Sequence, residues 1–85
     1  MTWEKDAEEL LDELVKPIPI FARPMARMGI ERKIKEVATD TITVDAVVRG
    51  YLLASSGSMR ERAIKLLEAK KIDMSPYEEL LAELK

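Results

Sequence analysis

The chain has 85 residues, of which 47% are hydrophobic and 35% charged, a composition typical of one small globular domain. It contains no cysteine and no histidine, which excludes thiolate nucleophiles, iron–sulfur and zinc–thiolate sites and the most common general base. Its net charge of −2 does not favour nucleic acid or a membrane surface as partner. The composition therefore predicts a non-enzymatic interaction domain without a cofactor or a bound metal.

The N-terminal residues carry no targeting signal that we can identify. They are acidic and lack the apolar core of a signal peptide. No uncharged stretch, residues 17–22 included, approaches the roughly 20 residues that span a bilayer. We therefore expect a cytoplasmic protein with no membrane contact.

The first predicted helix is acidic and amphipathic, and it ends before Pro17 because proline disfavours helical geometry in the preceding residue. Thr2 is the expected N-cap. We expect Trp3 to anchor the helix by burying its ring, with a role in an interface as the alternative. The apolar stripe recurs at helical spacing and consists of Trp3, Ala7, Leu10, Leu11 and Leu14.

The second predicted helix reaches about residue 38, and Pro24 either opens it or kinks a helix that begins near Pro19. It carries two apolar stripes, and we therefore expect it to be central and packed on both sides. Met25 and Met28, beside Phe21, are expected in the core, with an adaptable apolar surface as the alternative. The first stripe is Phe21, Met25 and Met28, and the second is Ala26, Ile30, Ile34 and Val37.

The rest of the chain predicts a short extended segment around Ile42 and three further helices. Thr43 is expected to cap the third helix, and capping boxes at Ser58 and Ser75 are expected to open the fourth and fifth. The fold class is therefore all-α, a small orthogonal bundle of about five helices with a very short extended segment near Ile42. We expect the second and third helices at its centre and the first packed across them.

Charge is strongly segregated along the chain. Residues 1–15 hold six acidic residues and one lysine, a net −5, whereas residues 16–35 hold six basic residues and one glutamate, a net +5. Arg23 and Arg27 lie one helical turn apart and can fork onto one carboxylate or phosphate. The competing interpretation is that the acidic helix neutralises the basic one within the domain. Glu31, four residues after Arg27, is expected to pair with it.

Several of these residues occur in an order that resembles one known family, the small C-terminal domain of the light-independent protochlorophyllide reductase B subunit. The similarity extends from Trp3 to Leu53, and the segment after Ser55 has no counterpart. The residues that carry it are Trp3, Ile18-Pro19-Ile20-Phe21-Ala22-Arg23, Arg27, Ile30-Glu31 and Ile42-Thr43-Val44-Asp45-Ala46-Val47.

The resemblance implies an accessory domain at residues 1–54 with a C-terminal helical extension at 55–85 packed on it. It does not imply reductase activity, because that chemistry needs iron–sulfur clusters that a chain without cysteine cannot hold. It implies instead a protein partner, such as a nitrogenase-like or tetrapyrrole-related assembly, or an anionic ligand. The expected binding residues are Trp3, Phe21, Arg23, Arg27 and Glu31.

Two other functions remain open from the sequence. The basic second helix and the order helix–short strand–helix near Ile42 suggest nucleic-acid binding, which the acidic composition disfavours. The similar acidic segments 8–14 and 78–84 suggest a self-associating structural protein. We expect a monomer or a weak homodimer.

Overall fold

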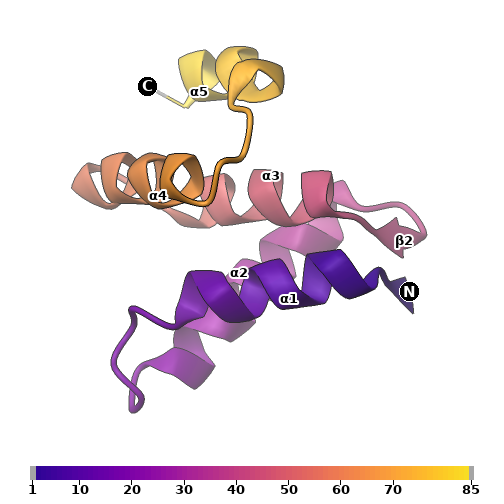
Figure 1. Cartoon of the computed structure of the whole chain (residues 1–85), viewed down its shortest axis with the longest axis vertical. Coiled ribbons are helices and arrows are strands. Elements are labelled where there is room, and N and C mark those ends of the chain that lie inside the picture. Colours follow the sequence, from indigo (N-terminus) through magenta and orange to yellow (C-terminus); the bar gives the residue numbers. More distant parts are fainter. Residues whose placement is uncertain (1, 85) are drawn as a thin grey trace.

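The computed structural model describes residues 2–84, and it confirms an all-α fold with five helices and one very short sheet near Ile42 (Figure 1). Helix α3 lies between the α1–α2 pair on one side and the C-terminal segment on the other (Figure 1). The elements are β1 (Thr2–Trp3), α1 (Lys5–Val15), α2 (Arg23–Val37), β2 (Thr41–Ile42), α3 (Val44–Ala54), α4 (Ser58–Ala69), the 3-10 turn η1 (Ser75–Tyr77) and α5 (Glu78–Glu83).

The chain start differs from its prediction, because Thr2 does not cap a helix. Thr2 and Trp3 are extended and pair in parallel with Thr41 and Ile42. The amide of Glu4 donates to the carbonyl of Ile42 at 3.0 Å, so α1 begins only at the next residue. The strand pairing therefore sets the start of α1. The local sequence of the N-terminus does not predict this pairing.

The centre of the molecule is the crossing of α2 and α3, with α1 packed across both, as predicted. A Cβ atom at Gly50 would lie 2.6 Å from the backbone nitrogen and 2.7 Å from the Cα of Ile34. Only glycine permits so close an approach of two helix backbones. The two helices contribute most of the core, together with α1; their buried hydrophobic residues are Ile30 and Ile34 of α2 and Ala46, Val47, Val48 and Leu52 of α3.

The predicted helix caps have mixed outcomes. Thr43 caps α3 as expected, since its Oγ1 accepts from the amide of Ala46 at 3.2 Å. The capping box at Ser58 is wrong: Gly57, with a left-handed φ of +58°, occupies the N-cap and Ser58 is the first helical residue. Ser75 does not cap a helix either, because its amide and hydroxyl both donate to Asp73 and only a 3-10 turn follows.

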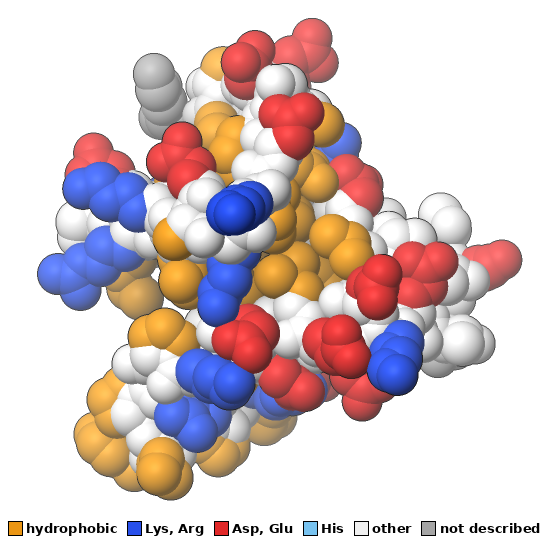
Figure 2. All heavy atoms as spheres, in the orientation of Figure 1, with side chains coloured by type: hydrophobic (Ala, Val, Ile, Leu, Met, Phe, Trp, Pro, Cys, Tyr) orange, Lys and Arg blue, Asp and Glu red, His pale blue; other side chains and the backbone are white. Residues whose placement is uncertain are grey.

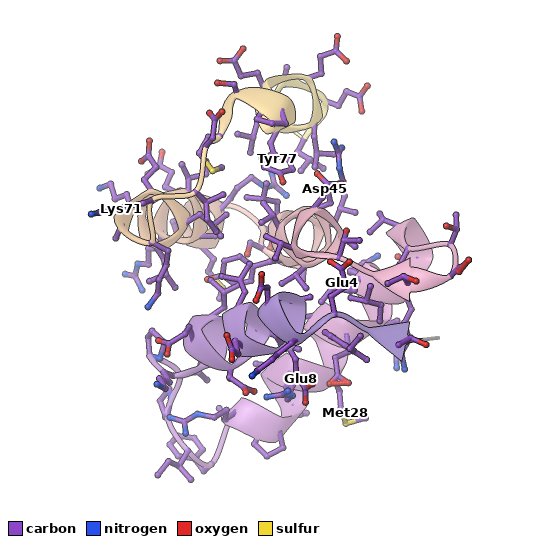
Figure 3. The ribbon with its side chains drawn as sticks, turned by 45° about the vertical axis from the view of Figure 1, so that its right-hand side comes forward. Glu4, Glu8, Met28, Asp45, Lys71 and Tyr77 are labelled. Carbon is purple, nitrogen blue, oxygen red and sulfur yellow. The ribbon has the colours of Figure 1, made fainter. Side chains whose placement is uncertain are left out.

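The C-terminal segment is fastened to α3 by specific contacts. The Tyr77 hydroxyl donates to Asp45 Oδ1 at 2.9 Å, and Figure 3 shows the two side chains facing each other. Arg60 donates to the carbonyls of Ser55 at 2.6 Å and Leu84 at 2.7 Å. These bonds join the start of α4 to the end of α3 and to the end of α5. Ala63, Leu67 and Tyr77 are buried in the same core as α1–α3.

Candidate functional site

Four large apolar side chains project into solvent around the start of α2. Ile20, Phe21, Met25 and Met28, here called the apolar tip, are 78%, 89%, 80% and 64% exposed. Figure 2 shows hydrophobic side chains gathered on the lobe formed by the α1–α2 connection and the start of α2. The expectation that Met25 and Met28 lie in the core is wrong, because α1 and α3 cover only the opposite face of α2, where Ile30 and Ile34 lie.

Arg23 stabilises the connection between α1 and α2, residues 16–22, where the tip begins. Its guanidinium donates to the carbonyls of Val15 (3.1 Å), Lys16 (2.9 Å) and Ile18 (2.9 Å). These carbonyls end α1 and begin the connection, and they have no helical partner of their own. Arg23 therefore holds the turn that presents the tip, and its donors are engaged with the backbone.

Arg27 is likewise engaged within the protein. Its Nη1 lies 2.7 Å from Asp12 Oδ1 and its Nε lies 3.3 Å from Glu31 Oε2, which confirms the expected pairing with Glu31. The hydrogen bond that Arg27 donates to Asp12 is the main cause that raises the pKa of Arg27. Arg23 and Arg27 thus face different internal acceptors and do not converge on one external anion.

Neutralisation of α1 by α2 is limited to a single contact. Within residues 2–84, Arg27–Asp12 is the one ion pair that joins the two helices. On α2, Arg32 and Lys35 are exposed and have no carboxylate partner in that part of the chain. They continue the helical spacing of Phe21, Met25 and Met28, so one exposed face is apolar at its start and cationic at its end.

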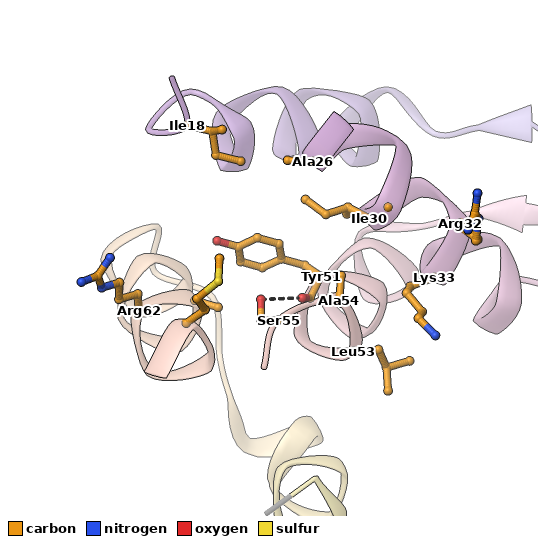
Figure 4. Close-up of a pocket in the computed structure, with 13 residues that line it drawn as sticks. Ile18, Ala26, Ile30, Arg32, Lys33, Tyr51, Leu53, Ala54, Ser55 and Arg62 are labelled. Carbon is orange, nitrogen blue, oxygen red and sulfur yellow. Dashed lines mark hydrogen bonds between the residues drawn. The ribbon is translucent and has the colours of Figure 1, made fainter. Parts of the chain in front are cut away.

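A groove adjoins this face. It has a volume of about 520 Å³ and lies between α2, α3 and α4, with Ile18 of the connection at its edge (Figure 4). The ring of Tyr51 lies across its floor, and burial raises the pKa of that phenol. The other lining residues are Ala26, Gly29, Ile30, Arg32 and Lys33 of α2, Leu53 and Ala54 of α3 with Ser55 just after it, and Met59, Arg62 and Ala63 of α4.

The predicted binding residues are only partly brought together. Phe21, Arg23, Arg27 and Glu31 lie on the first half of α2 or at its start. Trp3 lies on β1, half-buried against the core. It is at the start of α1, whereas the connection that begins the tip follows the other end of that helix (Figure 1). The sequence does not predict the groove, because its lining residues come from three helices. No local pattern in the sequence specifies how these helices pack.

The comparisons with known proteins point to a family and to one relative. The sequence model of the family described as "Protein of unknown function (DUF2621)" matches residues 1–81. The chain is 34% identical over 83 residues to "Membrane protein YneK" of Bacillus subtilis (strain 168). That match covers 93% of this chain and 58% of the relative, so the chain spans little more than half of the relative's length. No solved structure matches it.

These findings correct two expectations from the sequence. The resemblance to the protochlorophyllide reductase domain is wrong, because the matching family model describes DUF2621 and the matching relative is named a membrane protein. The expected cytoplasmic location is also contradicted, since the matched relative is named a membrane protein. Within residues 2–84, no helix is both long and apolar enough to cross a bilayer. The family match covers nearly the whole chain, and the protein belongs to DUF2621.

Proposed function

We propose that this chain is a non-catalytic docking module that binds the surface of an anionic membrane through the apolar tip and the cations beside it. The observation that carries the proposal is the exposure of four large apolar side chains, two on the connection that Arg23 holds and two on the first turns of α2. Soluble proteins rarely expose such contiguous patches unless another surface covers them. The naming of the relative as a membrane protein supports a lipid surface as that cover.

The energies are of the right size for reversible attachment. Burying a Phe or Met side chain completely contributes roughly 1.5–3 kcal/mol, and insertion into a headgroup region realises only part of this. Arg32 and Lys35 each add about 1 kcal/mol near an anionic surface. Together they give a few kcal/mol, which is sufficient to recruit the domain and weak enough to release it.

The charge distribution fixes one orientation. The acidic α1 is repelled by an anionic surface, whereas residues 16–35 carry a net charge of +5 and are attracted. Figure 2 shows the hydrophobic lobe with Lys and Arg side chains on it, and acidic side chains gathered beyond it. The domain therefore approaches a membrane with its tip first and α1 directed away.

Vesicle co-sedimentation tests the proposal. The wild-type chain should bind vesicles of phosphatidylcholine mixed with phosphatidylglycerol more tightly than vesicles of phosphatidylcholine alone. The double variant Phe21→Ser/Met25→Ser should bind the anionic vesicles about tenfold or more weakly, because it loses most of the inserted apolar area. Met59→Ser, which alters an exposed methionine on α4, should bind as wild type.

Two charge-reversal double variants distinguish binding through this face of α2 from general electrostatic attraction. Arg32→Glu/Lys35→Glu should weaken binding more than Lys65→Glu/Lys71→Glu, although both double variants change the net charge equally. Unchanged vesicle affinity of the Phe21→Ser/Met25→Ser variant overturns the proposal. A tip-dependent dimer in sedimentation velocity without vesicle binding also overturns it, and assigns the tip to a second copy of the chain.

A further inference from the structure

The groove between α2, α3 and α4 shares Arg32 with the proposed membrane contact, and its other lining residues have no part in that proposal. Its lining is mostly apolar and includes Ile18, Ile30 and Met59 together with the ring of Tyr51. Three cations, Arg32, Lys33 and Arg62, stand on its rim, and none of the thirteen lining residues is acidic. In a chain with more acidic than basic residues, such a rim selects for a ligand of negative charge.

The cations on the rim are not equally available. Lys33 lies 3.3 Å from Glu36, so its charge is partly neutralised within α2. Arg62 is exposed and makes no ion pair with a carboxylate in residues 2–84. Figure 4 shows Arg62 on α4, across the groove from Arg32 and Lys33; the ring of Tyr51 is directed toward the α4 side, and the guanidinium of Arg62 points outward, away from that ring. The Tyr51 hydroxyl makes no hydrogen bond within the described residues.

We propose that this groove binds a long-chain fatty acid, with the carboxylate accepting from the Tyr51 hydroxyl, the exposed Arg62 side chain turning inward to pair with it, and the acyl chain along the apolar lining. A guanidinium and a phenol are both donors suited to a carboxylate, and a volume of about 520 Å³ lies in the range of small-molecule sites. The site needs no metal, nucleophile or general base. It is separate from the tip and does not depend on membrane docking.

Gly29 offers a way to block the groove without disturbing the fold. A Cβ atom at this position meets nothing within 4 Å, and the glycine lies in the interior of α2. Leucine is a better helix former than glycine, so Gly29→Leu should fold at least as well as wild type while filling the groove. Gly29→Ala gives the same gain in helix propensity with a side chain too small to fill the site.

Isothermal titration calorimetry with monomeric palmitate provides the measurement. We expect wild type and Gly29→Ala to bind palmitate and Gly29→Leu to lose binding. Arg62→Gln should weaken palmitate about tenfold, as expected for the loss of a charged hydrogen bond, while the matched variant Lys65→Gln on the same helix binds normally. Hexadecanol, which lacks the carboxylate, should bind wild type about tenfold more weakly than palmitate does.

The outcomes also separate this site from the proposed membrane contact. Phe21→Ser/Met25→Ser should retain palmitate affinity, and Gly29→Leu should retain vesicle binding. Full palmitate affinity in Gly29→Leu, or equal affinity for palmitate and hexadecanol, overturns the assignment. Loss of palmitate binding in the tip variant alone also overturns it, because the acyl chain then lies on the tip and not in the groove.

Discussion

The two ends of α2 carry similar apolar side chains in opposite environments. From its middle onward, Ile30 and Ile34 are buried where α2 crosses α3. At its start, Phe21 and Met25 are among the most exposed large side chains of the described chain. The hydrophobic residues themselves do not account for the difference. It depends on what lies opposite: Gly50 lets the backbone of α3 approach Ile34, whereas no element within residues 2–84 covers the tip.

This contrast teaches that only one of the two apolar stripes of α2 is needed for folding. The stripe of Phe21, Met25 and Met28 begins at a connection whose backbone carbonyls accept from Arg23, and it contributes little to the core. Stability and binding should therefore respond to different substitutions along one helix. The following measurements test that separation.

The largest loss of stability is expected at the helix crossing. Gly50→Ala places a methyl group within 2.7 Å of the Ile34 backbone, so α2 and α3 must move apart. We expect a loss of about 3 kcal/mol in the free energy of unfolding, at the upper end of overpacking effects. Urea denaturation measures it. Gly29→Ala, on the open face of the same helix pair, is the matched control and should stabilise by up to about 1 kcal/mol. Equal effects at the two glycines would contradict the contrast between the faces.

A pH-dependent loss of stability is expected where Tyr77 packs against α3. Burial, followed by the hydrogen bond to Asp45, raises the pKa of Tyr77 to about 12. The neutral phenol is favoured in the folded state, so this contribution is complete below the ordinary pKa of about 10 and is lost as the pH rises to about 12. Its size is on the order of 2 kcal/mol. Urea midpoints across this pH range should fall in wild type and fall less in Tyr77→Phe; parallel curves would contradict the assignment.

The turn that presents the tip should depend on Arg23. Arg23→Ala removes the bonds to the carbonyls of Val15, Lys16 and Ile18, and we expect a loss of about 1–2 kcal/mol. Amide hydrogen exchange at residues 16–22 should accelerate at the same time. Arg23→Lys should rescue little, since an ammonium lacks the planar fork that serves several acceptors. Full stability and unchanged exchange in Arg23→Ala would show that the turn is held by other contacts.

The smallest effect on stability is expected at the tip itself. Phe21→Ser/Met25→Ser changes two side chains that contact almost nothing in the fold, so the free energy of unfolding should stay within about 0.5 kcal/mol of wild type. The variant that is expected to lose vesicle binding is thus expected to keep its stability. A loss comparable to that at Gly50 would mean that the tip belongs to the core.

Local patterns accounted for much of the secondary structure. The stripe of Ala7, Leu11 and Leu14 is buried as its spacing indicates, and Thr43 caps α3. The start of α1 was misplaced because a strand pairing across 39 residues overrides the local capping preference of Thr2. Met25 and Met28 were misplaced because helical periodicity identifies an apolar face without identifying whether another element covers it.

The candidate sites divide in the same way. The pairing of Arg27 with Glu31 follows from spacing along one helix, and the pairing with Asp12 follows only from how α1 lies on α2. The groove requires three helices to bring Ile30, Tyr51 and Arg62 to one cavity.

The sequence by itself determined the class of this protein: one small, helical, cysteine- and histidine-free domain with its charge divided between two neighbouring helices. Those properties depend on composition and on contacts within a few residues. Only the tertiary structure decided which apolar stripe of α2 is core and which is surface, because burial depends on neighbours that are distant in the chain. The net charge of −2 therefore indicates little about binding, whereas the packing leaves a face of α2 exposed to solvent that is apolar at its start and cationic at its end.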